Sequence, residues 1–218
     1  MNRKDLLELI SKGESSTLEF KRRISSFIKI AKEISAFANT IGGYLLIGID
    51  DDGAIIGVES EKGDIYQVLT TCEFYIDPPI IPDIEIVGIN GKDIIVVYIK
   101  ESNIKPHKLN ENPEDKHGFH KTYIRVGEKS VVASREMVRV LAGMSSTSKP
   151  ITLSIGDKEK RLFTYLDAHE RSTVKDFARL VNISDRRSER LLVRLVRAGV
   201  LQIHVDSNYD YSTLIEKI

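Results

Sequence analysis

The chain is poor in the residues that small secreted proteins and zinc-bound proteins depend on. It contains one cysteine, Cys72, and no tryptophan among 218 residues. A single thiol excludes an intramolecular disulfide and a zinc site built from several cysteines. We therefore expect a cytoplasmic protein whose fold is held together by side-chain packing.

Long apolar runs and a net charge of one sign are also absent. No stretch approaches the roughly 20 apolar residues that a membrane-spanning helix needs. The first ten residues mix charged and apolar side chains and lack a signal-peptide core. The 32 basic and 32 acidic residues cancel, which excludes a uniformly cationic DNA coat. We expect no membrane partner, and any nucleic-acid binding must come from local basic patches.

The N-terminal part alternates helical and strand patterns, which predicts an α+β domain. Apolar residues at helical spacing in 26–39 end at Gly42-Gly43, and the apolar run 44–49 predicts a central strand. Asn90-Gly91 predicts a tight hairpin turn between strands. The other predicted elements are helices at 5–11, 63–71 and 134–144, strands at 17–21, 54–58, 84–89, 93–99 and 122–126, and a polar loop at 101–120.

A serine-rich segment separates a second predicted domain. Residues 145–150 have the composition of a linker, so we place the domains at 1–146 and 151–218. The second domain contains three predicted helices followed by two strands, at 157–169, 174–181, 185–198, 200–205 and 209–214. This order is typical of a winged helix-turn-helix.

The third helix of this second domain is rich in arginine. Arg186, Arg190, Arg194 and Arg197 are at helical spacing and line one solvent-facing side of the helix, and Arg187 lies next to Arg186. We name Arg186, Arg187, Arg190 and Arg194 as nucleic-acid-binding candidates, since arginine contacts phosphates and reads guanine edges. The alternative is a solvated helix face paired with Glu189 and its neighbours.

Three motifs in the N-terminal part resemble those of one family. They are ESSTLEFK at 14–21, AFANTIGGYLLIGI at 36–49 and YIRVG at 123–127. Together they resemble the Schlafen/AlbA-type domain, also called the divergent AAA domain, over about residues 5–143. The resemblance implies a mixed sheet with helices and a role with nucleic acid.

The glycine pair of the second motif has two interpretations. No Gly-Lys-Ser/Thr sequence follows Gly42-Gly43, which excludes a Walker loop and its ATPase chemistry. Backbone amides of such a turn can approach a phosphate, but we expect the pair to allow close packing of a helix end against a strand. Asn39 and Thr40 are expected to bond carbonyls exposed there.

The acidic residues of the motifs carry the catalytic hypothesis. In Schlafen nucleases the matching carboxylates hold a divalent cation, which implies Mg²⁺ or Mn²⁺ here. The implied metal ligands are Glu14, Glu19 and Asp50 or Asp51, with Lys21, Arg22 and Arg23 near the same phosphate. Glu14 and Glu19 are five apart and can converge only if Glu14 lies in a turn before the strand. The alternative is that Glu19 pairs with Lys21 or another basic residue.

Three histidines raise a weaker possibility of a metal site. His107, His117 and His120 fall in the predicted polar loop with acidic residues nearby. We expect them to be chance members of that loop.

Two functions fit these patterns. The first is a DNA-binding transcriptional regulator, expected to act as a homodimer. The second is a metal-dependent endoribonuclease that cleaves structured RNA such as tRNA, with the winged helix docking the substrate. A protein-interaction adaptor is a third, less favoured hypothesis. We favour the regulator because it requires fewer steps, and we leave open whether the protein is an enzyme.

Overall fold

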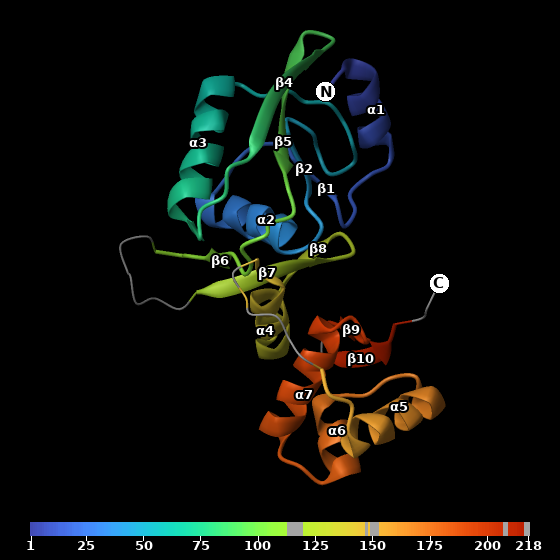
Figure 1. Cartoon of the computed structure of the whole chain (residues 1–218). Coiled ribbons are helices and arrows are strands. Elements are labelled where there is room, and N and C mark those ends of the chain that lie inside the picture. The colour runs from blue at the N-terminus through green and yellow to red at the C-terminus, as the bar shows by residue number, and fades with distance from the viewer. Residues whose placement is uncertain (113–119, 147, 149–152, 207–208, 216–218) are drawn as a thin grey trace. The chain divides into compact units, whose positions relative to one another are not determined.

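A computed structural model of the chain describes residues 1–112, 120–146, 148, 153–206 and 209–215. They form two compact units, Met1–Val132 and Ala133–Ile218 (Figure 1). The division falls before α4 (Arg135–Met144) and not in the serine-rich segment at 145–150. This helix therefore belongs with the second unit, whereas the sequence places it in the first domain.

The first unit is built on a mixed four-stranded sheet. Its strand order is β1 (Leu18–Lys21), β2 (Gly43–Ile47), β5 (Lys92–Ile99) and β4 (Asp83–Ile89). β1 is parallel to β2, and the other neighbours are antiparallel. Asn90 and Gly91 join β4 to β5 with φ angles of 51° and 76°, as a type I′ turn requires. The predicted hairpin and the predicted mixed sheet are confirmed.

Helices cover both faces of this sheet. α2 (Phe27–Asn39) and α3 (Glu61–Phe74) lie on one face, and α1 (Arg3–Ser11) lies on the other (Figure 1). Side chains alternate along β2, so that Leu45 packs in the core under α2 and α3 while Leu46 packs in the core under α1. Burial on both faces explains why residues 44–49 form an almost unbroken apolar run.

A second, smaller sheet packs against α2. It is antiparallel and has the order β3 (Ile76–Asp77), β6 (Lys108–Leu109), β7 (Lys121–Val126) and β8 (Lys129–Val132). β6 lies in the segment that polarity predicts as loop, so that prediction is wrong at these two residues. Their strand character comes from pairing with distant segments, which local composition does not report.

The predicted strand at 54–58 is not formed. Ile55 makes only an isolated bridge to Ile49. The next two backbone N–H groups, of Ile56 and Gly57, both donate to the Gly48 carbonyl at 2.9 Å. Gly57 has a φ of +83°, so the chain turns away from the neighbouring strand. The Asp52-Gly53 turn is therefore followed by a loop.

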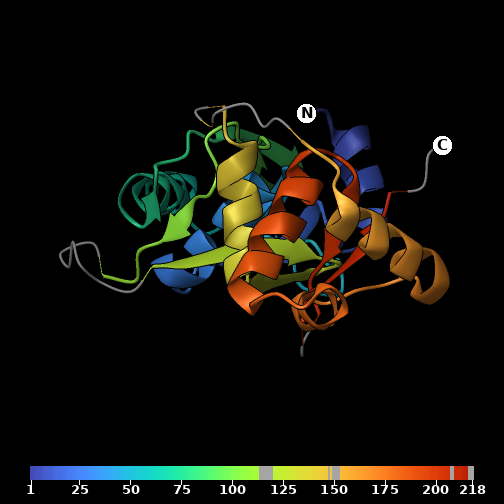
Figure 2. The same cartoon turned by 60° about the horizontal axis from the view of Figure 1, so that its bottom comes forward.

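The second unit contains the predicted order of elements. After α4 come α5 (Asp157–His169), α6 (Val174–Val181), α7 (Asp185–Arg197), β9 (Leu201–His204) and β10 (Tyr211–Leu214). β9 and β10 are antiparallel, and Ser172 adds a bridge to Ser212. The shared core consists of Leu162, Leu166, Phe177, Val181, Leu192, Leu195 and Leu201. α4 lies alongside α7 (Figure 2).

Two findings concern the single cysteine and the lack of long apolar runs. Cys72 is buried on α3, and this burial raises the pKa of its thiol to about 12, so the thiol stays protonated at neutral pH. Among the described residues, no helix is both long enough and apolar enough to cross a bilayer.

Candidate functional site

Glu14 lies outside β1 and folds back onto it. Ser15 forms an antiparallel bridge with Leu18, which turns the chain before the strand. The Glu14 Oε1 atom accepts a hydrogen bond from the backbone N–H of Phe20 at 2.9 Å. Glu14 therefore reaches the strand beside Glu19, although five residues along a regular strand would put the two side chains on opposite faces.

The pKa of Glu14 shows which charges surround this carboxylate. Burial has the largest effect and raises the pKa, while the backbone hydrogen bond lowers it. The negative charges of Glu19 and Asp51 raise it further, and the positive charge of Lys21 lowers it. Asp51, and not Asp50, is among these charges. Four of the seven residues implied by the resemblance, Glu14, Glu19, Lys21 and Asp51, thus interact electrostatically.

Glu19 is buried, and both of its carboxylate oxygens have cationic partners. Oε2 accepts a hydrogen bond from Arg125 Nη1 at 2.8 Å, and Oε1 accepts one from Lys21 Nζ. Lys21 Nζ also donates to the Phe20 carbonyl at 2.8 Å. Glu19 is therefore held in a buried ion pair, which is the alternative that the sequence left open.

Arg125 is the centre of this buried network. Its Nη1 also donates to Glu33 Oε2 at 3.0 Å and to Ser130 Oγ at 3.3 Å, while Nη2 donates to the Ser15 carbonyl. The guanidinium carbon lies 4.7 Å from the centre of the Phe37 ring, within cation–π range. One arginine of β7 thus compensates two buried carboxylates, one on β1 and one on α2.

Two of the other candidates form a weaker pair at the surface. Arg22 Nη1 lies 3.4 Å from Asp50 Oδ2, and Asp50 Oδ1 accepts a hydrogen bond from the Asp51 backbone N–H at 3.2 Å. Arg23 is exposed, and its side chain has no hydrogen-bond or ion-pair partner in the described part of the chain. Of the three basic residues of this segment, Arg23 is the one available to a phosphate.

The carboxylates of this region do not form a ready metal site. Across the described ranges, no three Asp, Glu, His or Cys side chains are grouped so that they can hold a metal ion. Glu19 is committed to Arg125 and Lys21, and Asp50 to Arg22. Two of the four implied ligands, Glu19 and Asp50, therefore already serve cations of the chain itself. The Mg²⁺ or Mn²⁺ site stays a prediction.

Gly42 and Gly43 allow a close approach of backbone segments. A Cβ atom on Gly42 would lie 2.6 Å from the Ile99 carbonyl oxygen, and one on Gly43 would lie 2.6 Å from the Phe37 ring and 2.7 Å from the Thr17 carbonyl oxygen. Neither position leaves room for a side chain. The prediction that the pair serves close packing is confirmed.

Of the two polar residues before the glycine pair, Thr40 forms the expected contact with a carbonyl of the helix end, and Asn39 does not. Thr40 Oγ1 donates to the Ala36 carbonyl at 2.7 Å. Asn39 Nδ2 donates to the carbonyls of His107 and Tyr123 at 2.8 and 2.9 Å, and its Oδ1 accepts from the His107 backbone N–H at 2.7 Å. Asn39 thus ties the end of α2 to two distant segments and not to its own helix end.

His107 is buried and hydrogen-bonded, and is not a chance residue of a polar loop. Nδ1 lies 2.7 Å from the Pro78 carbonyl oxygen and Nε2 lies 2.6 Å from Ser102 Oγ. Because a carbonyl only accepts, Nδ1 carries the hydrogen, and in the neutral imidazole Nε2 accepts from the serine hydroxyl. His117 lies outside the described residues.

The burial of His107 leads to a pH-dependent stability. Burial is the largest effect and lowers the pKa of His107, while the Pro78 carbonyl and Asp77 raise it. The unfolded chain therefore takes up a proton on His107 more readily than the folded chain does. For this reason the free energy of unfolding decreases as the pH falls below about 6.5, the ordinary pKa of histidine. We expect His107→Gln to weaken the dependence of the unfolding free energy on pH between about 7 and 5. Equal pH dependence in the parent and the variant, with exposed His169→Gln as control, would contradict this.

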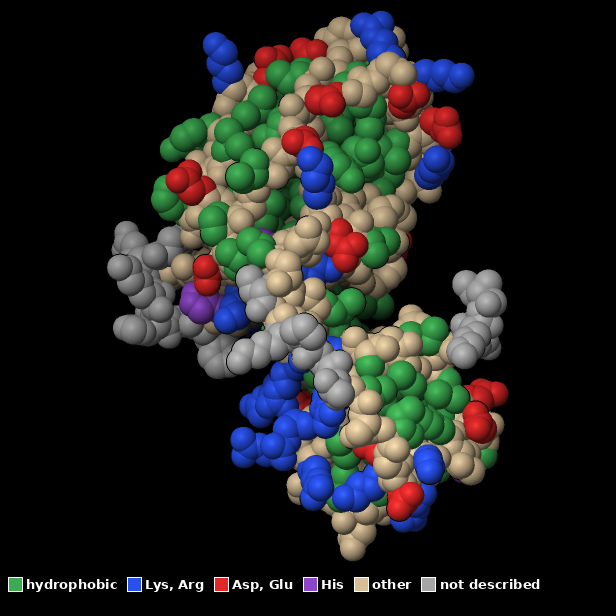
Figure 3. Space-filling view, viewed as in Figure 1, with side chains coloured by type: hydrophobic (Ala, Val, Ile, Leu, Met, Phe, Trp, Pro, Cys, Tyr) green, Lys and Arg blue, Asp and Glu red, His purple; other side chains and the backbone are tan. Residues whose placement is uncertain are grey.

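The arginines of α7 fall into two groups. Arg186, Arg187 and Arg190 are exposed, and Arg194 is half-buried. Figure 3 shows Lys and Arg side chains gathered over α7. In the described residues the Arg186 and Arg187 side chains have no hydrogen-bond or ion-pair partner. We call Arg186, Arg187 and Arg190 the α7 arginine surface.

Glu189 does not neutralise the α7 arginine surface. Its carboxylate forms an ion pair with Arg139 of α4. Arg197 also faces α4, where its side chain fills the space that a Cβ atom on Gly143 would occupy. Its Nη2 lies 3.5 Å from Ser148 Oγ. Arg197 therefore packs α7 against α4 and is not part of the α7 arginine surface, although its spacing predicts the same strip.

A comparison with known families matches the first unit. The model described as Schlafen, AlbA_2 matches residues 14–134, more than half of the 218 residues. The chain belongs to this family. The matched segment begins at Glu14 and includes Arg125, whereas α5, α6 and α7 lie beyond its end.

Two solved structures resemble part of this Schlafen family protein. One is the crystal structure of the DIP2311 protein from Corynebacterium diphtheriae, at 22% identity and a TM-score of 0.46 over 71% of the chain. The chain spans 37% of that protein. The other is the solution structure of the N-terminal domain of a RecG-related protein from Nitrosomonas europaea, at 22% identity and a TM-score of 0.44, covering 72% of the chain and 96% of that domain. The assignment of the chain to the family therefore rests on the match of residues 14–134 to the family model.

Sequence reasoning missed two members of the buried network in this Schlafen domain. Neither Arg125 nor Glu33 was named, although Arg125 lies within the third motif. A signal exists in α2, where Glu33 falls among the apolar positions Ile30, Ile34 and Phe37 that face the core. A carboxylate on a buried helix face needs a cation, and a motif arginine is the natural candidate.

Proposed function

We propose that this Schlafen family protein binds nucleic acid, and that its C-terminal unit is a winged helix-turn-helix that binds duplex DNA in a transcriptional regulator. Family membership supports a nucleic-acid-related role. The element order of the C-terminal unit supports the type of module, since three helices precede a two-stranded pair. In such modules the helix after the turn enters the major groove, and that helix here is α7.

The observation that carries the proposal is the α7 arginine surface. Arg186 and Arg187 lie in the first turn of α7 and Arg190 lies one turn further, which is where a recognition helix contacts bases and phosphates. A guanidinium offers five N–H donors that suit phosphate oxygens and the guanine edge. The three arginines are exposed, and Glu189 does not neutralise them because it is paired with Arg139. The positive charge of this surface therefore faces solvent.

The turn before α7 has the geometry that the proposal needs. α6 ends at Val181, and its C-cap Asn182 is left-handed, with a φ of 52° and a ψ of 61°. Ser184 is the N-cap of α7, which begins at Asp185. This short turn fixes the direction of α7 relative to α6. We include a homodimer in the proposal, because two such helices about 34 Å apart would meet successive major grooves.

Removing two arginines tests the proposal. We expect Arg186→Ala/Arg190→Ala to lower the slope of log K against log salt by about 2, because each lost phosphate contact lowers it by about 1. Affinity at low salt should fall at least tenfold. The measurement is fluorescence anisotropy with a 30-base-pair duplex at several salt concentrations.

A control with the same change in charge makes this test specific. Lys160 and Arg161 are exposed on α5, and Lys160→Ala/Arg161→Ala also removes two positive charges. We expect this variant to keep the parent slope. If the two double variants lose affinity equally, the α7 arginine surface has no special role and the proposal is wrong.

The endoribonuclease alternative has less support from the geometry. It requires Glu14, Glu19 and Asp50 or Asp51 to share a divalent cation, whereas Glu19 is paired with Arg125 and Lys21. The same preparation can be assayed on tRNA with Mn²⁺. Cleavage by the parent that disappears in Glu19→Ala, with DNA affinity unchanged by the α7 substitutions, would replace our proposal by the enzyme.

A further inference from the structure

The solvent-facing side of α3 carries large apolar side chains. Val68 and Cys72 of this helix are buried in the core, whereas Tyr66 and Leu69 are 67% and 47% exposed. α3 lies at one side of the first unit, with α2 and the sheet on its inner side (Figure 1). The outer side of a surface helix is normally polar. This side of α3 is therefore a candidate for a surface that packs against another helix.

Two charged residues flank the exposed apolar pair. Lys62 lies four residues before Tyr66, and Glu73 lies four residues after Leu69. Residues at these spacings share one face of a helix. Both charged side chains are exposed, and neither has a hydrogen-bond or ion-pair partner in the part of the chain that the structure describes. We call Lys62, Tyr66, Leu69 and Glu73 the α3 strip.

The α3 strip is complementary to itself. In an antiparallel pair of α3 helices centred midway between Tyr66 and Leu69, positions at equal distances from the centre face each other. Lys62 and Glu73 lie equally far from that centre, on opposite sides of it. Lys62 of one copy then faces Glu73 of the other, Tyr66 faces Leu69, and the two-fold axis repeats both contacts. The strip thus supplies two ion pairs and an apolar centre when its partner is a second copy.

We propose that two copies of this chain form an antiparallel homodimer through the α3 strip. The apolar centre provides the burial, and the end charges fix the direction, because a parallel pair would place Lys62 against Lys62 and Glu73 against Glu73. Packed helices lie about 8–10 Å apart, a distance that lysine and glutamate side chains bridge together. A contact of one helix from each copy is small, so the expected Kd is on the order of 10 µM.

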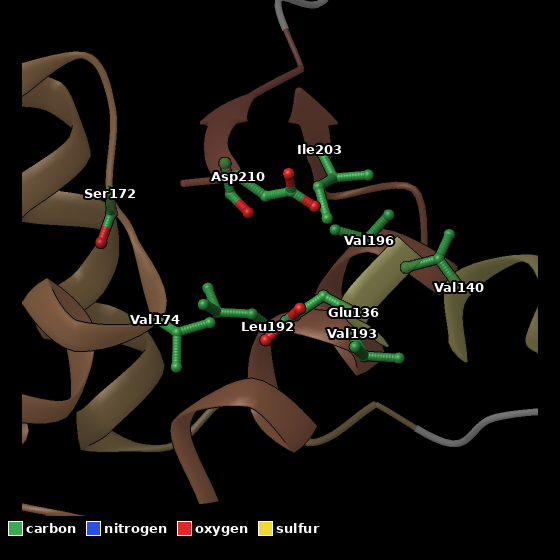
Figure 4. Close-up of a pocket in the computed structure, with 10 residues that line it drawn as sticks. Glu136, Val140, Ser172, Val174, Leu192, Val193, Val196, Ile203 and Asp210 are labelled. Carbon is green, nitrogen blue, oxygen red and sulfur yellow. The ribbon is translucent and has the colours of Figure 1, made fainter. Parts of the chain in front are cut away.

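The hollow beside α4 and α7 in the second unit is a poorer contact for a second copy. Its lining includes Val140, Leu192 and Val196, and its free space of about 20 Å³ holds about one water molecule (Figure 4). Its two charged side chains, Glu136 and Asp210, are both acidic. A two-fold contact at this hollow would bring like charges together, whereas the α3 strip pairs opposite charges.

Analytical ultracentrifugation of the full chain without DNA tests the proposal. We expect mainly dimer at about 100 µM and mainly monomer at about 1 µM, as a Kd of about 10 µM requires. Because DNA is absent, the loss of the dimer and the loss of DNA binding by the α7 arginine surface are recorded separately. A parent chain that stays monomeric up to about 200 µM would overturn the proposal.

Charge reversals test the pairing of the strip. Lys62→Glu and Glu73→Lys each replace both ion pairs by like-charge pairs, so each variant alone should dimerise at least about tenfold more weakly. An equimolar mixture of the two variants restores both pairs and should dimerise about as strongly as the parent. Lys4→Glu, at an exposed position of α1, is the matched control and should not weaken the dimer. If either reversal dimerises as the parent does, or if the mixture stays as weak as its components, the dimer does not use the α3 strip.

Discussion

Replacing Arg125 by methionine is expected to lower the unfolding free energy of the first unit by about 3–5 kcal/mol. The variant leaves Glu19 and Glu33 buried without the cation that now bonds to both of them. It also removes the donor to the Ser15 carbonyl. Methionine keeps much of the side-chain volume, so that most of the loss reports uncompensated charge and unmet hydrogen bonds.

Amide hydrogen exchange in β5 is the suitable measurement, because it reports on the first unit alone and the chain has no tryptophan. Arg23→Met is the matched control. Arg23 is exposed and unpartnered in the described part of the chain, so the change should stay within about 0.5 kcal/mol. A loss below about 1 kcal/mol for Arg125→Met would show that the buried network contributes little.

A compensating substitution distinguishes lost charge balance from lost packing. If uncompensated charge is the cause, adding Glu19→Gln and Glu33→Gln to Arg125→Met should recover part of the stability, since neutral amides cost less to bury.

Gly43→Ala is expected to destabilise the first unit by about 1–3 kcal/mol, towards the upper end. The new Cβ would lie 2.7 Å from the Thr17 carbonyl oxygen, a backbone atom that cannot move alone, and 2.6 Å from the Phe37 ring. That ring lies under the guanidinium of Arg125, so its displacement would also disturb the buried network. Thermal unfolding followed by circular dichroism checks this.

Gly88→Ala provides the comparison within the same sheet. Gly88 lies in β4, and its added Cβ would meet only the flexible end of the Asp93 side chain, at 3.1 Å. Alanine loses less backbone entropy than glycine, so Gly88→Ala should be neutral or slightly stabilising. If Gly43→Ala and Gly88→Ala had the same melting temperature, the close approach of β2 to Phe37 would not contribute to the stability of the first unit.

The features that sequence predicts well are those specified by neighbouring residues. Asn90-Gly91 predicts the β4–β5 hairpin because the turn conformation depends on these two residues. Ser134 predicts the start of α4, and its side chain does accept from the Met137 backbone N–H at 3.0 Å. Apolar spacing predicts α2 and α7 for the same local reason.

Distant pairing explains what sequence reasoning did not find. Arg125 and Glu19 are 106 residues apart, and no local pattern brings them together. The loop at 54–58 has strand-like residues, but the backbone N–H groups of Ile56 and Gly57 both donate to the Gly48 carbonyl. The site residues themselves were named from the motifs, and of these the structure brings Glu14, Glu19, Lys21 and Asp51 into electrostatic contact. Their partners could not be read from spacing.

The position of α4 determines where the chain can be dissected. A fragment that starts at residue 151, as the serine-rich segment suggests, would leave Val193 and Val196 of α7 facing water and remove the partner of Glu189. Valine side chains that become exposed to solvent promote self-association. A fragment that starts at Ala133 keeps this helix. Fragments of the C-terminal part should therefore treat residues 133–144 as the first helix of one folding unit and not as the tail of another.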